Sequence, residues 1–398
     1  MTILSIVIPA YNEEHGIAEI ASRVLSVGPA LKEAGIDHLE LLVVDDGSKD
    51  RTAEVASNIP GVRLIRHPRN KGYGAALKTG FARASGELIG FLDADGTYPP
   101  EYFPQLCRAA LNGTDLVIGS RMAGEDSKMP LTRRVSNFFF ATLLSLLGRQ
   151  KVTDSASGMR VFKRSILEQI YPLPDGLNLT PVMSTRALHE GITMGEVPIP
   201  YSERVGRSKL SVIRDGSIFL QSMVWTVLSY NPVRILGLLG LAGLAIAALV
   251  FLSLVIARLN GVTSLGPWGV AALFTALIGS VAGINLFALG ATFNYLVSLF
   301  YKRPIRQGLF GKPIFKTPLD QQFGWMGMLS TLTGIAMAVV SLALGVSGWE
   351  IERLWFYLLG SALAFLAGIQ LIIYWLLFRV LQELNQREVL TKQDMDLN

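Results

Sequence analysis

Short apolar runs alternate with stretches of helical character over the first 120 residues. Apolar runs of four to eight residues that alternate with helices are typical of a mostly parallel β-sheet covered by helices. The runs expected to form strands are Leu4–Pro9, Leu39–Asp45, Val62–Arg66, Glu87–Leu92 and Asp115–Gly119. The helices expected between them are Glu14–Val27, Asp50–Ser57, Gly74–Ala84 and Pro100–Leu111. We therefore expect an α/β fold in which ligands bind at the carboxyl ends of the strands.

Four long apolar stretches, almost free of charge, occupy the second half of the chain. They are Ile235–Ala257, Trp268–Phe300, Trp325–Val346 and Leu354–Phe378. A helix needs about 20 such residues to cross a bilayer, so an α-helical transmembrane domain of four spans is predicted over residues 231–380. The second stretch is long enough for one span and an amphipathic continuation. The basic connection 302–316 is expected in the cytoplasm, together with the tail 381–398.

Two shorter apolar segments precede the spans. Phe138–Leu147 lies between basic residues and is too short to cross a bilayer, and Ser217–Tyr230 resembles it. We expect helices near 132–148 and 211–230 that lie in the membrane surface; ordinary core helices are the alternative. Both would belong to a first domain that covers residues 1–230.

Charge and cysteine content narrow the class of protein. The 398-residue chain is 50% hydrophobic and carries a net charge of +5. Its basic residues flank the apolar spans, so the charge is explained by membrane topology and no nucleic-acid partner is expected. A single cysteine, Cys107, excludes an internal disulfide, and four histidines give no zinc-type cluster. The N-terminus lacks the basic start of a signal peptide, which favours a cytoplasmic first domain.

The segment Asp93-Ala94-Asp95 follows the fourth predicted strand. Residues i and i+2 of an extended segment point the same way, so two carboxylates converge at the carboxyl end of a strand. A hard divalent cation such as Mg²⁺ or Mn²⁺ relieves their repulsion and can bridge to phosphate oxygens. A solvated turn with two acids is the alternative when this pattern is considered alone.

Polar loops also follow the other predicted strands. They are Pro9–Glu14, Val44–Ser48, Arg69–Gly74 and Gly119–Arg121. They offer an aromatic ring for a base, carboxylates for a ribose hydroxyl or base N–H, a glycine-rich helix entry for close backbone approach, and a cation. Helix capping would explain Asp46 or Ser48 equally well. Five consecutive strand ends with such groups favour a nucleotide site.

The five motifs, P-A-Y-N-E-E, V-V-D-D-G-S, N-K-G-Y-G-A-A, D-A-D and G-S-R, resemble in this order glycosyltransferase family 2, whose fold is GT-A. D-S-A-S-G-M-R at residues 154–160 and R-V-G-R-S-K at 204–209 resemble its polyprenyl-phosphate branch, typified by dolichol-phosphate mannose synthase. The similarity covers about residues 1–230. The resemblance implies a Rossmann-like GT-A domain that transfers a sugar from a nucleoside diphosphate to undecaprenyl or dolichyl phosphate, with Mg²⁺ or Mn²⁺ and inversion at the anomeric carbon.

The resemblance also implies roles for individual residues. Those expected to bind the nucleotide-sugar are Pro9, Tyr11, Glu13, Asp46, Lys71, Asp93, Ala94, Asp95, Arg121, Arg204 and Lys209. Those expected at the acceptor phosphate are Arg133, Arg134, Ser136, Arg204 and Lys209. The expected catalytic residues are Asp95, Arg121 and Asp154, although a structural cap fits Asp154 as well. The branch often has glutamine two residues after the second aspartate; here Thr97 would ligate the metal weakly or leave its place to water.

Two other functions stay open at this point. A processive polysaccharide synthase shares the fold, but its Q-x-x-R-W sequence is matched only by Gln221–Trp225, without the arginine. The spans could form a lipid-sugar translocation or partner-recruiting module, yet they hold almost no charge to mark a polar path. The expected partners are a nucleoside-diphosphate sugar, a polyprenyl phosphate, the membrane and a possible second copy of the chain. An integral membrane protein is expected, in the plasma membrane if the source is prokaryotic.

Overall fold

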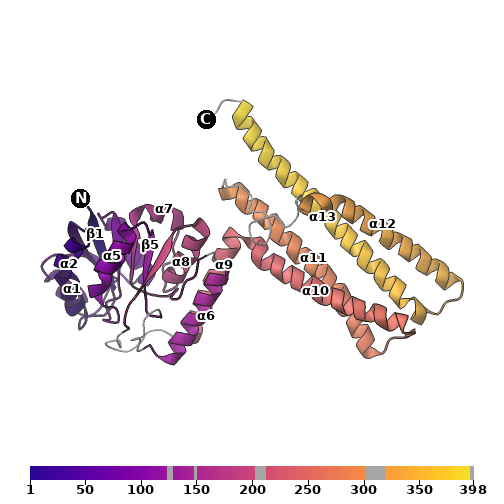
Figure 1. Cartoon of the computed structure of the whole chain (residues 1–398), viewed down its shortest axis with the longest axis horizontal. Helices are drawn as coiled ribbons and strands as arrows, with labels where there is room; N and C mark the ends of the chain where they lie inside the picture. The colour runs from indigo at the N-terminus through magenta and orange to yellow at the C-terminus, as the bar shows by residue number, and fades with distance from the viewer. Residues whose placement is uncertain (123–128, 148–149, 202–211, 302–318, 395–398) are drawn as a thin grey trace. The chain divides into compact units, whose positions relative to one another are not determined.

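The computed structural model of the chain describes residues 1–122, 129–147, 150–201, 212–301 and 319–394. Contacts divide it into a β/α unit, Met1–Val227, and a helical unit, Leu228–Asn398. In Figure 1 the β/α unit runs from indigo to magenta and the helical unit from orange to yellow.

Within the described residues, a seven-stranded sheet forms the centre of the β/α unit, in the order β3-β2-β1-β4-β6-β5-β7. β6 is antiparallel to β4 and β5, and the other neighbours are parallel. The strands are β1 (Ile3–Ala10), β2 (His38–Asp45), β3 (Val62–Arg66), β4 (Leu88–Phe91), β5 (Leu116–Ser120), β6 (Arg160–Lys163) and β7 (Met194–Pro198). The mostly parallel sheet is confirmed, with β1 to β5 within one residue of the expected ends; β6 and β7 were not expected.

Helices cover both faces of this sheet because its central strands are apolar on both sides. Side chains of β1 alternate between two buried clusters: Leu4, Ile6 and Ile8 belong to one and Val7 to the other. Helices α1 and α5 pack on the first cluster, and α4 and α8 on the second. The helices of this unit are α1 (Ile17–Ser26), α2 (Gly28–Glu33), α3 (Thr52–Ser57), α4 (Tyr73–Arg83), α5 (Phe103–Leu111), α6 (Leu131–Leu147), α7 (Leu167–Ile170), α8 (Leu179–Glu190) and α9 (Val212–Tyr230), with short 3₁₀ turns η1 (Pro100–Tyr102) and η2 (Arg164–Ile166).

Helices α6 and α9 form at the two places where helices of the membrane surface were expected. Phe140 and Leu144 of α6 pack against Met223 of α9 in a small buried cluster. The other side of α6 exposes an apolar stripe, formed by Leu131, Val135, Phe138 and Phe139, each more than half exposed. The spacing of this stripe is that of one helix face. The structure therefore gives α6 an unburied apolar face, while its position in a membrane stays a prediction.

The helical unit consists of α10 (Pro232–Leu259), α11 (Pro267–Tyr301), α12 (Leu319–Val346) and α13 (Ile351–Asp394). Among the described residues, these four helices are long and apolar enough to cross a membrane, and they fit an integral membrane protein. The continuation expected after the second span belongs to the same unbroken helix, α11. α10 and α11 pack closely at Gly240 and Gly283, where a Cβ on either glycine would lie within 2.8 Å of the other's carbonyl oxygen. The basic connection 302–316 falls outside the described residues.

Candidate active site

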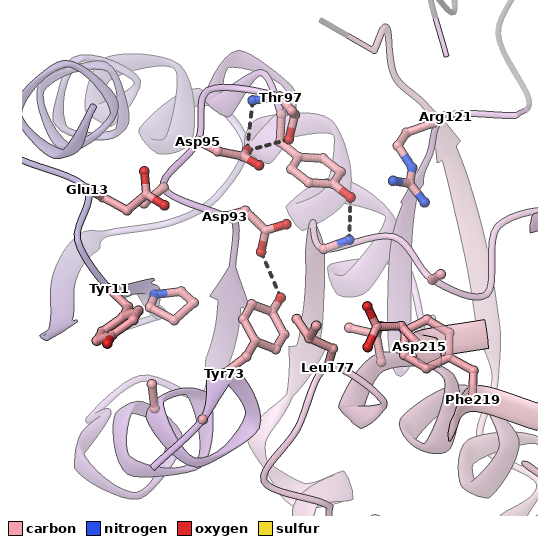
Figure 2. A pocket seen from close by; sticks show the side chains of 18 of the residues that line it. Tyr11, Glu13, Tyr73, Asp93, Asp95, Thr97, Arg121, Leu177, Asp215 and Phe219 are labelled. Carbon is pink, nitrogen blue, oxygen red and sulfur yellow. Dashed lines mark hydrogen bonds between the residues drawn. The ribbon is translucent and has the colours of Figure 1, made fainter. Parts of the chain in front are cut away.

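A cavity of about 410 Å³ lies at the carboxyl edge of the sheet (Figure 2). All five strand ends that were expected to carry chemistry contribute to its wall. The contributions are Tyr11 after β1, Asp46 after β2, Gly72 after β3, Asp93 after β4 and Arg121 after β5. β1 lies between β2 and β4, so their polar ends meet where the strand order reverses, the usual ligand position of such sheets.

Most residues predicted for the site line this cavity. They are Pro9, Tyr11, Glu13, Asp46, Asp93, Ala94, Asp95, Thr97, Arg121 and Ser136. Lys71 and Arg134 are exposed and are not among the lining residues, and Asp154 is fully buried beneath Arg121. Arg204 and Lys209 lie outside the described residues, as does the side chain of Arg133.

Hydroxyl groups orient both carboxylates of the acidic pair. Tyr73 donates a hydrogen bond from its hydroxyl to Asp93 Oδ1 at 2.8 Å. Burial, and then the charge of Asp93, hold the pKa of Tyr73 well above its usual value, so Tyr73 is a neutral donor at physiological pH. Thr97 donates from Oγ1 to Asp95 Oδ1 at 2.6 Å, and its backbone N–H donates to the same oxygen at 3.1 Å. Each aspartate thus has one oxygen fixed by a neighbouring hydroxyl.

The Thr97 contact refines the expectation for that residue. The threonine is buried, and its hydroxyl is directed at the Asp95 carboxylate. In the structure Thr97 therefore orients Asp95, and its weak ligation of a metal stays a prediction.

The acidic pair fits a hard divalent cation that is shared with phosphate. Two oriented carboxylates face the cavity, and within the described ranges no group of three or more His, Cys, Asp or Glu side chains could enclose an ion. Mg²⁺ in particular is usually held by one or two carboxylates together with substrate phosphates and water. Asp93 and Asp95 would therefore hold the ion from one side only.

Asp46 is almost fully buried and organises the loop after β3. Its Oδ1 accepts hydrogen bonds from His67 Nδ1 at 2.7 Å and from the Lys71 backbone N–H at 2.9 Å, and its Oδ2 accepts one from the Gly72 N–H at 2.8 Å. The other ring nitrogen of His67 contacts Thr79 Oγ1 at 2.9 Å. These hydrogen bonds fix the Asp46 carboxylate at the cavity wall. His67 is a supporting residue that the sequence did not reveal.

Arg121 and Asp154 form a buried ion pair at the edge of the cavity. The guanidinium donates from Nε and Nη2 to the two carboxylate oxygens at 2.7 and 2.8 Å, and the Arg121 backbone N–H donates to Oδ2 at 3.0 Å. Burial would raise the pKa of Asp154, but the charge of Arg121 and the hydrogen bonds that Arg121 donates together outweigh burial and lower that pKa. The same attraction raises the pKa of Arg121 despite its burial. Asp154 therefore stays ionised and holds the Arg121 guanidinium at the cavity wall.

The glycine-rich entry to α4 packs against the protein's own chain. The sequence favoured close approach of a ligand at Gly72 and Gly74. In the structure, a Cβ on Gly72 would lie 2.5 Å from the Asp175 carbonyl oxygen, and one on Gly74 would overlap that of Pro174. The Ala75 backbone N–H donates to the Asp175 carbonyl at 3.1 Å. The glycines thus fix the loop after residue 173, although Gly72 also reaches the cavity.

Three residues at the far end of the cavity were not among the predicted site residues. Leu177, Asp215 and Phe219 line it opposite Tyr11 and Glu13, and the acidic pair lies between the two ends (Figure 2). α6 contributes further lining residues, Ser136, Asn137 and Phe140. One continuous cavity thus joins the strand ends to a region beside α6 and α9 that has both polar and apolar lining residues.

Comparisons with known proteins match both halves of the chain. Residues 5–171 match the family described as Glycosyl transferase family 2, and residues 232–392 match a Domain of unknown function (DUF8752). The dolichyl-phosphate hexose transferase of Haloferax volcanii is 32% identical over 221 residues, which are 56% of this chain and 92% of that protein. The undecaprenyl-phosphate 4-deoxy-4-formamido-L-arabinose transferase of Edwardsiella ictaluri is 29% identical over 310 residues, 75% of this chain and 89% of that protein.

Solved structures with a similar fold include glucosyl-3-phosphoglycerate synthase from Mycobacterium tuberculosis, crystallised with Mn²⁺, uridine diphosphate and phosphoglyceric acid. It is 23% identical, covers 57% of this chain and 78% of its own, and has a TM-score of 0.44.

Proposed function

The chain belongs to glycosyltransferase family 2, in its polyprenyl-phosphate branch, and on that premise we propose that it transfers a sugar from a nucleoside-diphosphate sugar to a polyprenyl phosphate. One observation carries the proposal. The acidic pair lies within a single cavity, between the polar strand ends and the region beside α6 and α9. Such a cavity can hold a donor and an acceptor on the two sides of one reacting centre.

The donor would occupy the strand-end region. Tyr11 offers a ring against which a base can stack, and Glu13 and Asp46 offer acceptors for ribose hydroxyls or a base N–H. The diphosphate would then reach Asp93 and Asp95, which would hold Mg²⁺ or Mn²⁺. Bound there, the cation would neutralise the negative charge that develops on the departing nucleoside diphosphate.

The acceptor would enter beside α6 and α9. Ser136 lies in the cavity wall on α6, and the exposed stripe of Leu131, Val135, Phe138 and Phe139 on the same helix fits insertion into the membrane surface. A lipid phosphate carried by that surface would meet the cavity at the end beside α6 and α9. The proposed basic contacts Arg204 and Lys209 lie outside the described residues.

The reaction would be a single displacement with inversion. An oxygen of the lipid phosphate attacks the anomeric carbon, a new carbon–oxygen bond forms, and the bond to the nucleoside diphosphate breaks with its electron pair. The phosphate is already anionic at neutral pH, so the step needs no strong general base. Arg121, fixed by Asp154 at the cavity wall, supplies positive charge close to the reacting phosphates. We further propose that this domain faces the cytoplasm, as the basic connection 302–316 indicates.

The test is transfer by the purified full chain. The protein in detergent is incubated with labelled nucleoside-diphosphate sugars and either undecaprenyl or dolichyl phosphate, with Mg²⁺, with Mn²⁺ or with a chelator. We expect one labelled lipid product that the chelator abolishes. Asp95→Asn should remove activity, whereas Asp115→Asn, at a partly exposed ion pair with Lys163, should retain it. Undiminished transfer by Asp95→Asn or in the presence of chelator would rule out the metal-dependent mechanism.

A further inference from the structure

The segment between α6 and β6 lies directly against the acidic pair. A Cβ built on Gly158 would lie 2.5 Å from Asp93 Oδ2 and 2.9 Å from both Oδ1 and Cγ. These distances are far below an ordinary contact of 3.4 Å, so a side chain at this position competes directly with the carboxylate. The backbone of Gly158 thus limits where Asp93 can lie.

Both flanks of Gly158 are fixed. Its backbone N–H donates a hydrogen bond to the hydroxyl of Tyr98 at 2.7 Å. Burial raises the pKa of Tyr98, so this hydroxyl remains neutral. Four residues earlier, Asp154 is paired to Arg121 in the cavity wall. The segment therefore connects the cation at the end of β5 with the carboxylate at the end of β4.

Arg160 holds the segment from inside the protein. It is fully buried and donates hydrogen bonds to the carbonyl oxygens of Ser155 at 2.8 Å and Ser157 at 3.1 Å, and to Ser184 Oγ at 2.9 Å. Burial lowers the pKa of Arg160 to about 10, with the nearby Asp154 opposing that shift, so the side chain is charged at neutral pH. Guanidinium has a rigid, planar set of donors, which suits it to hold two backbone carbonyls at once.

We propose that the segment Asp154–Arg160 positions the Asp93 carboxylate of the proposed metal site, with Gly158 as the surface against which Asp93 is set and Arg160 as the internal anchor of that surface. The inference rests on the proposed metal site at Asp93 and Asp95. Position 158 therefore requires glycine because the Asp93 carboxylate lies so close to it. The backbone conformation does not impose this requirement, since φ at Gly158 is not in the left-handed region. Groups that orient metal ligands typically change metal affinity about 10–100-fold when they are altered.

Gly158→Ala tests the proposal. The new methyl group forces the Asp93 carboxylate to move from 2.5 Å to an ordinary contact near 3.4 Å, and the moving atoms are the end of a side chain. We expect Mn²⁺, measured by electron paramagnetic resonance with the full chain in detergent and without substrate, to bind about 10–100-fold more weakly. The melting temperature should stay close to that of the parent protein. Gly28→Ala is the matched control because a Cβ there meets no atom within 4 Å.

Each outcome has a clear meaning. Equal Mn²⁺ binding by Gly158→Ala and the parent protein would overturn the positioning role while leaving the metal site intact. Failure of Gly158→Ala to fold would also overturn it, because the strain would then fall on the backbone segment. No Mn²⁺ binding by the parent protein would instead refute the proposed metal site, and the inference with it.

Discussion

Asp154→Asn tests the ion pair that holds Arg121 at the cavity wall. The substitution keeps the size of the side chain but removes its charge, and leaves the guanidinium, whose side chain is only 12% exposed, without its carboxylate. Removal of one partner from a buried pair costs about 3–5 kcal/mol. For a unit of this size, 1 kcal/mol changes the melting temperature by about 2–4 °C. The expected fall in melting temperature is therefore roughly 6–20 °C.

The assay is thermal unfolding of the full chain in detergent, monitored by intrinsic fluorescence. Asp115→Asn removes the same charge from the Asp115–Lys163 pair, whose side chains are 29% and 35% exposed. Such surface pairs contribute about 0–1 kcal/mol, so this control should melt within about 4 °C of the parent protein. If the melting temperatures of both variants fall by the same amount, the buried pair does not hold Arg121 at the cavity wall.

The contribution of Asp154 to stability depends on pH with a definite sign. The pKa of Asp154 is lowered in the folded protein, so its contribution to stability is present above the unfolded pKa of about 4 and is lost as the pH falls through the lower folded value. The difference in melting temperature between the parent protein and Asp154→Asn should thus be constant near neutral pH and should shrink only below about pH 4.

Two further variants probe the groups that orient the site. Thr97→Val keeps the shape of the side chain but removes the hydrogen bond to Asp95, and should weaken Mn²⁺ binding about tenfold in a direct titration; unchanged affinity would show that Thr97 does not orient the carboxylate. His67→Phe removes a donor to Asp46 and should raise KM for the nucleotide-sugar about two- to tenfold, the equivalent of one hydrogen bond of roughly 0.5–1.5 kcal/mol, while kcat changes little. A fall in kcat without a change in KM would contradict the assignment of Asp46 to the donor.

Local sequence patterns predicted the first five strands because each is an apolar run that ends in a polar loop. They could not predict β6 and β7. β6 has only four residues, Arg160–Lys163, and begins with a charged residue that lies fully buried. A buried arginine is explained only by its acceptors, and Ser184 comes from a helix more than twenty residues away. No local pattern reports such a contact.

The candidate site likewise contains some residues that local sequence patterns predict and others that they do not. Residues directly after parallel strands converge at one edge, so Tyr11, Asp93 and Arg121 could be grouped from strand order alone. Leu177 and Asp215 reach the cavity from segments that tertiary packing brings there. Lys78, for example, ties down the loop before Leu177 by donating a hydrogen bond to the carbonyl oxygen of Leu173 at 2.8 Å.

This division has a consequence for specificity. The residues near the acidic pair belong to recognisable motifs, and in the proposed function they would bind diphosphate and metal, which are common to many donors. The residues at the other end of the cavity, Leu177, Asp215 and Phe219, belong to no motif. With the donor in its proposed place, a sugar attached to that diphosphate would extend toward them. A carboxylate beside two apolar side chains can accept hydrogen bonds from sugar hydroxyls while the apolar groups limit the size of substituents. Differences in sugar selection between relatives should therefore follow changes at these three positions more closely than changes in the motifs.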